Sequence, residues 1–598
     1  MNYKDRTEEI FTRAEKYKKS KRKKLLCIAS GVIAVAVAFS CVLFVPYPEQ
    51  KTDLSAYRTS KYYALMQKIE TVTRRKNIYK NNWEKWTDGL YKRDFAGSDS
   101  NTEMEGRQQY VETTDNQTEG VVEGDLLKRG DRYAYYFSAD GALKIYSVAG
   151  AASVQEGEYV LNLPDGEFVC ASWQNAEIYL NETCTCVTVV AEGYGEDKVC
   201  RTAIIPLDVS SVDNVKQGEA RYVTGGYVSS RSVDGVITVV TDFRMYAPDF
   251  SEEKTFIPAS GSAHGLTNFK PEEIISPATL SLSSYTVVCN YEDGEITSRL
   301  AFLSYNTEIY VSAENLYLVH PFTEEKNGKF HNVVEIARTS YRDGVEYKGS
   351  VTLDGSVKNQ YSMDEKEGIL RVVTTLSQPQ TAALYCVDID TFIVTAKLEA
   401  FAPEGESVQS VRFDGDKVYV CTAVVRTMTD PVFVIDLSDR NNIGLKDTGE
   451  IKGYSTSLRK FYGDTLLGIG YGESRALKVE IYKETANALT PTVSFSDESY
   501  FEFSQEYKSY FIDAERGLVG IPVCGGGGYG YILLRYDGET LQKTNEIIYT
   551  DAINYSDFKR ELKETRAFLA NGYLYVFTRN AFTPISLTVT SETEENVA

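Results

Sequence analysis

The clearest pattern in the chain is a short alternation of apolar and polar residues that returns, in different residues, from about residue 121 to about residue 590. It is plainest in Ser410–Leu437, where Val411–Phe413 leads to an Asp-Gly-Asp turn, and Val418–Val420 and Val432–Ile435 then alternate again. Alternation with a period of two, broken by turn residues, indicates antiparallel β-strands. Because a unit of this size cannot bury its own apolar face, we expect neighbouring units to cover one another.

Nine units of strand, turn and strand follow this pattern. They cover Asp125–Val148, Phe168–Leu207, Gly226–Val240, Leu300–Leu318, Asn359–Val387, Ser410–Leu437, Leu458–Ile481, Tyr510–Arg535 and Ala567–Val589. A spacing of about 50 residues is typical of propeller blades, and propellers have about 4–8 of them. The pattern predicts an all-β fold, a β-propeller of about eight or nine blades over residues 113–590, with one unit incomplete and the first unit joined to the last.

A different pattern precedes the strands. Leu25–Val45 is an uncharged stretch of 21 residues, long enough to cross a bilayer core of about 30 Å. The 24 residues before it hold ten Lys and Arg against four Asp and Glu, a bias typical of the cytoplasmic side. We expect a cytoplasmic basic tail over residues 1–24, a single-pass transmembrane helix over 25–45 and an extracytoplasmic propeller. A signal peptide cleaved after Ala36–Ala38 and a lipoprotein linked through Cys41 are the alternatives.

Residues 46–112 are expected to form a helical stalk and a linker. Tyr62, Leu65, Met66, Ile69 and Val72 recur at helical spacing, and residues 96–110 are polar and rich in turn formers. The last eight residues, 591–598, are predicted to be a disordered tail.

Charge and cysteine content exclude several functions. The chain has a net charge of −21, and beyond the basic tail 54 Lys and Arg face 81 Asp and Glu, so a nucleic-acid partner is not expected. None of the ten cysteines shows the spacing of a zinc site. Cys186 and Cys200 have the spacing of partners across a hairpin, which leaves a disulfide open. We expect no metal and no cofactor.

Histidine chemistry is poorly supported by the sequence. The chain has three histidines, His264, His320 and His331, and none forms an HExxH motif or follows a GxSxG elbow. His320 follows Val319 at the expected end of a strand, so we expect it to be a surface or edge residue. The sequence therefore predicts no catalytic triad and no catalytic residues.

Two groups of charged residues are candidate ligand contacts. Asp364 and Glu365 are adjacent acids, and if they lie in a strand they point to opposite faces. Arginines at four equivalent places precede turns in the first strands of their units: Arg231, Arg412, Arg459 and Arg566. If first strands line the central channel, these arginines form a basic collar for an anionic ligand. The alternative is that each arginine pairs with an acid of the next blade.

Several stretches together resemble a bacterial and archaeal family of secreted or membrane-bound proteins with a C-terminal β-propeller distantly related to WD-40 repeats. The residues that carry the resemblance are Thr113–Lys128, Tyr227–Arg231, Asn359–Glu365, Leu370–Thr375, Arg412–Asp416, Asp430–Asp439 and Leu466–Gly470. They occur in the same order over most of residues 113–580. Val122 departs from the family pattern, which tends to an acid there. The resemblance implies a propeller placed outside the cytoplasm, and it brings no assigned activity.

The sequence thus predicts a membrane-anchored binding or scaffolding module for a protein or glycan partner of the cell envelope. The alternative is an envelope-acting hydrolase that uses carboxylates at the mouth of the propeller channel.

Overall fold

A computed structural model of the protein describes residues 52–73, 110–111, 116–118, 120–162, 169–170, 173–195, 197–305, 308–423, 429–447, 451–472, 476–485, 489–525, 528–549 and 555–587. The expected basic tail, membrane span and C-terminal tail lie outside these residues. None of the helices among the described residues combines the length and the apolar character that a membrane span needs.

The chain divides into two compact units, Met1–Tyr63 and Ala64–Ala598. In the first unit, a short 3-10 helix, η1, covers Ser55–Tyr57. Residues 63–73 are helical, in agreement with the apolar spacing from Tyr62 to Val72. All the strands belong to the second unit.

The described part of the second unit contains nine sheets of three or more strands, which we number in chain order. Sheet 1 holds β1 (Tyr110–Val111), β3 (Leu127–Gly130), β4 (Tyr133–Phe137), β5 (Ala142–Ser147) and β6 (Gln155–Val160). Sheet 2 holds β7 (Val169–Cys170), β8 (Glu177–Leu180), β9 (Cys186–Tyr194), β10 (Cys200–Asp208), β11 (Lys216–Gln217), β12 (Arg221–Thr224), β15 (Ala259–Ser262) and β16 (Gly265–Asn268). Sheet 3 holds β2 (Val122–Glu123), β13 (Gly226–Val233), β14 (Val236–Arg244), β17 (Ile274–Ile275), β18 (Ser284–Glu292) and β19 (Glu295–Leu303).

The middle sheets are simpler and mostly have four consecutive antiparallel strands. Sheet 4 holds β20 (Ile309–Val311), β21 (Asn315–Lys326), β22 (Lys329–Ser340) and β23 (Glu346–Asp354), and sheet 5 holds β24 (Met363–Lys366), β25 (Ile369–Ser377), β26 (Gln380–Asp388) and β27 (Val394–Leu398). Sheet 6 holds β28 (Ser407–Asp414), β29 (Lys417–Ala423), β31 (Val432–Asp436) and β32 (Gly444–Asp447), and β30 (Thr429–Asp430) pairs separately with β33 (Ile451–Lys452).

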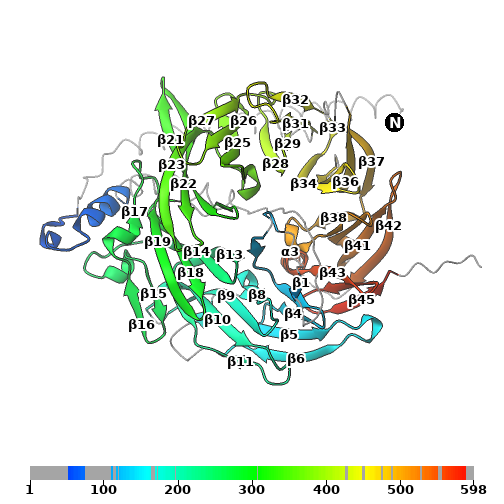
Figure 1. The fold of residues 1–598 in the computed structure, drawn as a ribbon, viewed down its shortest axis with the longest axis horizontal. Coiled ribbons are helices and arrows are strands. Elements are labelled where there is room, and N and C mark those ends of the chain that lie inside the picture. The colour runs from blue at the N-terminus through cyan, green and yellow to red at the C-terminus, as the bar shows by residue number, and fades with distance from the viewer. Residues whose placement is uncertain are drawn as a thin grey trace, which may run out of the picture. The chain divides into compact units, whose positions relative to one another are not determined.

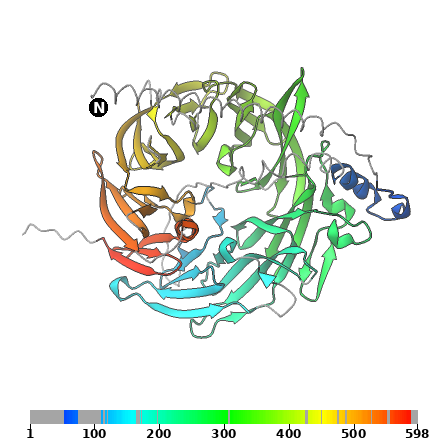
Figure 2. The ribbon, with the colours of Figure 1, turned by 180° about the vertical axis from the view of Figure 1, so that it is seen from behind.

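Sheets 7 to 9 complete the unit. Sheet 7 holds β34 (Tyr454–Phe461), β35 (Thr465–Tyr471), β36 (Leu477–Glu484) and β37 (Leu489–Asp497), and sheet 8 holds β38 (Tyr500–Phe503), β39 (Phe511–Asp513), β40 (Leu518–Gly525), β41 (Gly528–Tyr536) and β42 (Leu541–Tyr549). Helix α3 (Tyr555–Glu564) leads to sheet 9, with β43 (Arg566–Ala570), β44 (Tyr573–Phe577) and β45 (Phe582–Ser586). Figures 1 and 2 show these sheets following one another around a ring, with β28, β34 and β43 toward its middle.

Shared apolar cores explain the ring. Side chains of sheets 6 and 7 form one core, those of sheets 7 and 8 a second, and those of sheets 8 and 9 a third. The last and first sheets also share a core, in which Tyr575 and Phe577 of β44 pack with Leu127, Ala134 and Tyr136. Each sheet therefore buries its apolar faces against its neighbours, as the repeated pattern predicts, and the propeller architecture is confirmed. The number of blades stays a prediction.

Candidate functional site

Polar side chains from several sheets gather around a segment from the start of the domain, residues 120–126, which we call the central segment. Its strand β2 adds to the edge of sheet 3, where Glu123 lies opposite Arg231 of β13. Two residues on, the backbone of Asp125 pairs with that of Ile178 in sheet 2. The central segment therefore connects sheets 3, 2 and 1 before β3 begins.

Glu123 is buried and is held by three groups from different parts of the chain. It accepts a hydrogen bond from the hydroxyl of Tyr507, in the short 3-10 helix η7 (Tyr507–Ser509) that follows β38. Its carboxylate lies 3.3 Å from Arg231 Nη2 and 3.9 Å from Lys508 Nζ. Arg231 also donates to Gln360 Oε1 at 2.9 Å, from 3-10 helix η6 (Gln360–Ser362) before sheet 5. Glu123 thus joins sheet 3 to η7, and Arg231 extends the connection to η6.

Asp125 makes the equivalent connection to the last sheet. Arg566 Nε donates to Asp125 Oδ1 at 2.6 Å, and both side chains are buried. Arg566 also donates to the carbonyl oxygens of Lys563 and Thr565 at 2.6 and 2.9 Å. A charge-assisted hydrogen bond between buried groups is strong and directional, so Arg566 fixes the start of sheet 9 against the central segment.

Lys508 and Glu177 form the third pair. Lys508 Nζ donates to Glu177 Oε1 at 2.6 Å and to the carbonyl oxygen of Gly124 at 2.5 Å, and the hydroxyl of Tyr227 donates to the same carboxylate. Burial by itself lowers the pKa of Lys508, but the carboxylates of Glu177 and Glu123 outweigh it and raise the pKa. The lysine therefore stays charged.

We call these groups the central polar cluster: Glu123, Asp125, Glu177, Tyr227, Arg231, Gln360, Tyr507, Lys508 and Arg566. Three carboxylates face three cations, so charge is balanced within the cluster. Removing one partner of a buried pair leaves an uncompensated charge, which is strongly destabilising. The arrangement suits a structural lock between sheets better than catalysis, which needs groups free to exchange protons with a substrate.

One acid beside the cluster behaves differently. Burial raises the pKa of Glu506, and the nearby cations of Arg566 and Lys508 offset the rise in part. A carboxyl with a raised pKa is what the alternative hydrolase hypothesis requires, and Glu506 is such a residue beside the central polar cluster.

Of the four arginines named from the sequence, three lie at the same place, as the sixth residue of β13, β28 and β34, whereas Arg566 is the first residue of β43. Arg231 and Arg566 belong to the central polar cluster. Their acidic partners, Glu123 and Asp125, come from the central segment, whereas the pairing considered from the sequence was to the next blade. Arg459 is buried and its Nε lies 3.5 Å from Ser457 Oγ, and Arg412 is half-buried. A ligand role for the four stays a prediction.

Asp364 and Glu365 point to different partners, as expected of neighbours in a strand. Asp364 accepts from Arg371, its cross-strand partner in sheet 5. Glu365 reaches sheet 4, where it accepts from Ser312 Oγ and Tyr317 OH, each at 2.7 Å. The two carboxylates do not converge, and Glu365 ties sheet 5 to sheet 4.

The prediction that His320 is a surface or edge residue at the end of a strand is wrong about the strand end and about the surface. Strand β21 continues to Lys326, so His320 lies within it, and its side chain is 0% exposed between the rings of Tyr305 and Phe322. Its Nε2 lies 2.8 Å from Ser281 Oγ and its Nδ1 lies 3.3 Å from Glu335 Oε2. Serine, histidine and glutamate therefore meet in a row, which the sequence did not predict because Ser281 lies 39 residues before His320.

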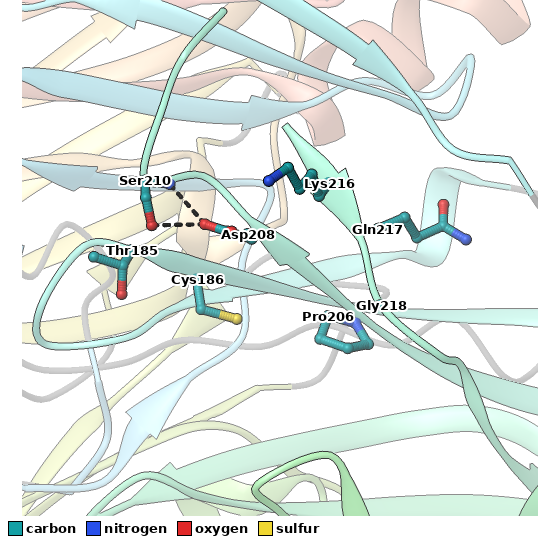
Figure 3. Close-up of a pocket in the computed structure, with 8 residues that line it drawn as sticks. All are labelled: Thr185, Cys186, Pro206, Asp208, Ser210, Lys216, Gln217 and Gly218. Carbon is teal, nitrogen blue, oxygen red and sulfur yellow. Dashed lines mark hydrogen bonds between the residues drawn. The ribbon is translucent and has the colours of Figure 1, made fainter. Parts of the chain in front are cut away.

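A surface pocket of about 460 Å³ lies on sheet 2, outside the central polar cluster, lined by Thr185, Cys186, Pro206, Asp208, Ser210, Lys216, Gln217 and Gly218 (Figure 3). Asp208 accepts from the backbone nitrogen and the hydroxyl of Ser210 at 3.0 and 2.6 Å, which lowers its pKa. The carboxylate is thus already hydrogen-bonded within the chain.

The disulfide left open between Cys186 and Cys200 is not formed. Cys186 lies opposite Asp208 and Cys200 opposite Tyr194, at the two ends of the β9–β10 pair, and both thiols are free. In the part of the chain that the structure describes, no group of three or more His, Cys, Asp and Glu side chains is arranged to hold a metal ion.

Comparisons with known proteins give relatives without a described activity. The chain is 29% identical over 259 residues to an uncharacterised protein of Archaeoglobus fulgidus, covering 43% of this chain and 39% of that protein. It is 27% identical over 256 residues to an uncharacterised protein of Methanocaldococcus jannaschii, covering 38% and 40%. The chain thus spans about two fifths of the length of these relatives.

Among solved structures, the chain is similar to Sqt1 from Chaetomium thermophilum, at 10% identity and a TM-score of 0.33, covering 67% of this chain and 93% of that one. It is also similar to a quinohemoprotein alcohol dehydrogenase of Pseudomonas putida, at 10% identity and a TM-score of 0.32, covering 77% and 71%. Scores this low carry no functional argument. Residues 111–588 match the family described as the beta propeller domain, and the chain belongs to that family.

Proposed function

We propose that the protein is a binding or scaffold module, anchored in the membrane by residues 25–45 and displayed outside the cell, where it holds a protein or glycan of the envelope. Propellers commonly act through exposed edges and faces of a rigid ring. The observation that carries the proposal is a contrast within this ring: the charges of the central polar cluster are matched with one another, while the β21–β22 hairpin exposes the aromatic side chain of Phe330 to solvent.

The hairpin is unusually long for this ring. Its strands have 12 residues each, and β23 pairs with β22 only from Val333 onward. Asn327 and Gly328 both have positive φ, 56° and 73°, which is the two-residue turn that matches strand twist and favours Asn-Gly. Phe330, beside the turn, is 64% exposed. Exposed aromatic side chains on a rigid element are typical contact residues of protein interfaces.

Two measurements test the proposal. In intact cells, protease added outside should digest residues 110–587 of the full-length protein, and protection of the domain would contradict external display. Cross-linking in the same cells should capture a protein or glycan with the wild type and much less with Phe330→Asp. Leu445→Asp is the matched control, because Leu445 is a 43% exposed apolar residue on β32 of sheet 6. Equal capture by both variants would contradict a role for the hairpin.

Glu506 gives the hydrolase alternative its one specific support. If a carboxylate at the ring centre performs acid–base catalysis, Glu506→Gln should abolish glycan hydrolysis by the purified protein while leaving its unfolding midpoint close to that of the wild type.

A further inference from the structure

Ser281, His320 and Glu335 form a cluster away from the central polar cluster, which we call the outer cluster. Ser281 lies in the connection that leads to β18 of sheet 3, and it is exposed. His320 and Glu335 lie directly opposite each other on β21 and β22 of sheet 4. The packing of one sheet beside the next therefore brings the serine to the histidine.

The order of contacts matches that of a nucleophile, a base and an orienting acid. Ser281 Oγ lies 2.8 Å from His320 Nε2, within the range of a nucleophile and its base. His320 Nδ1 lies 3.3 Å from Glu335 Oε2, and such contacts are often long before substrate binds. Ser281 Oγ also lies 3.2 Å from the carbonyl oxygen of Pro321, a second acceptor for its proton.

Glu335 is built to stay ionised and in place. Its other oxygen accepts from Ser350 Oγ at 2.7 Å and from Tyr305 OH at 3.2 Å. Burial pushes the pKa of Glu335 up, but the hydrogen bonds from His320, Ser350 and Tyr305 outweigh burial and hold the pKa below its usual value. An ionised Glu335 accepts a hydrogen bond from the protonated Nδ1 of His320. The lone pair of Nε2 is then directed at the serine hydroxyl.

The environment allows substrate to reach the serine but keeps the base fixed. His320 is 0% exposed between the rings of Tyr305 and Phe322, at centroid distances of 5.2 Å each, so its orientation is set by packing. Ser281 is exposed, and Leu282 beside it is 37% exposed. A nucleophile on an open surface suits an ester that projects from a larger molecule.

We propose that the outer cluster is a catalytic site for acyl transfer from carboxylic esters, with Ser281 as nucleophile, His320 as general base and Glu335 as the positioning residue. Ser281 Oγ forms a bond to the ester carbonyl carbon as its proton passes to His320 Nε2. The bond between the carbonyl carbon and the alcohol oxygen then breaks, and His320 returns the proton to the departing alcohol. Water, activated by His320, attacks the acyl-serine and releases the carboxylic acid and free Ser281.

The test treats the full-length protein with a fluorophosphonate, which bonds to activated serines, and with para-nitrophenyl acetate as the ester. We expect mass spectrometry to find the phosphonyl group on Ser281. Ser281→Ala should lose the label and at least about 10²-fold of the ester hydrolysis rate. Ser210→Ala is the matched control, because Ser210 is an exposed serine that donates to a carboxylate without a histidine. Absence of label on Ser281, or an equal rate in Ser281→Ala, would overturn the proposal.

A second measurement does not depend on substitution of buried His320. In Ser281→Cys, an imidazole at hydrogen-bond distance should convert the thiol to the thiolate. We expect iodoacetamide near neutral pH to alkylate Cys at position 281 before Cys186 and Cys200. Burial raises the pKa of those two native thiols, that of Cys200 to about 12. Slower alkylation at position 281 than at Cys186 would overturn the assignment of His320 as a base. The proposal is independent of the partner-binding function.

Discussion

The central polar cluster and the outer cluster both hold buried or half-buried carboxylates, but they pair these carboxylates with different groups. In the central polar cluster, three cations and three carboxylates face one another, and Glu123, Arg231 and Arg566 are at most 5% exposed. In the outer cluster the acid and the histidine are equally well held, but the third member is an exposed hydroxyl. Every charge in the central polar cluster is thus matched inside the protein, whereas the row of contacts in the outer cluster ends at a group that a solvent-borne molecule can reach.

The largest effect on stability is expected when one charge is removed from the central polar cluster. Glu123→Gln should lower the free energy of unfolding by about 3–5 kcal/mol, because Arg231 and Lys508 lose their shared carboxylate while buried. Urea denaturation measures the loss. Adding Arg231→Met to Glu123→Gln should cost less than the sum of the two single changes. A loss below about 1 kcal/mol in Glu123→Gln would show that the cluster does not lock the sheets.

A buried carboxyl that accepts no hydrogen bond gives a second test of how burial affects a charged group. Glu564, at the end of α3, is 2% exposed, and among the described residues neither of its carboxylate oxygens has a hydrogen-bond partner. Burial raises its pKa, so the folded state holds the proton longer than the unfolded state. Its contribution to stability is present below the unfolded pKa and is lost as pH rises through the folded pKa.

Glu564→Gln should therefore stabilise the protein at neutral pH by about 1–2 kcal/mol, with little effect where the carboxyl is protonated in both states. Urea denaturation at several pH values measures the change. Equal effects of the substitution at acidic and neutral pH would contradict the assignment.

The outer cluster should contribute little to stability. Ser281→Ala removes a hydroxyl from an exposed connection, and we expect a loss of at most about 1 kcal/mol in the free energy of unfolding. The urea midpoint of this variant should stay close to that of the wild type while ester hydrolysis falls. A large drop in stability would show that Ser281 serves to attach the connection to sheet 4.

The smallest effect is expected for an exposed ion pair. Lys326 Nζ lies 2.9 Å from Asp354 Oδ1, with both side chains about half exposed. Asp354→Asn should change the free energy of unfolding by about 0.3 kcal/mol, because solvent screens the pair. A change as large as that of Glu123→Gln would mean that burial is not what separates the two regions.

The sequence predicted the repeated part of the fold well, because the local alternation of apolar and polar residues is enough to mark its strands. The alternation from Val411 to Ile435 became β28, β29 and β31. Eight of the nine predicted units have strands in eight different sheets of the described chain, whereas the fourth, Leu300–Leu318, joins the end of β19 in sheet 3 to β20 and β21 of sheet 4. The strand β2 was missed, because two residues are too few to show a period in the sequence. Its partner strand β13 begins about 100 positions later, at Gly226, so no local pattern links the two.

The candidate sites were predicted less well, for the same reason. Position relative to turns singled out Arg231 and Arg566, but their acids are 108 and 441 positions away, and no local pattern marks such contacts. His320 was misplaced because the apolar run ends at Val319 while the strand continues to Lys326. Its meeting with Ser281 depends on how sheet 4 lies beside sheet 3, which a single sequence does not specify.

The central segment has a consequence for synthesis on the ribosome. Asp125 leaves the exit tunnel 441 residues before Arg566, which neutralises it. A nascent chain halted before β43 would hold an acid with no counterion and a first sheet with one apolar face open to water. The ring is thus expected to reach its final form only after β43 to β45 have left the exit tunnel, and its growing intermediates should be natural clients of folding factors.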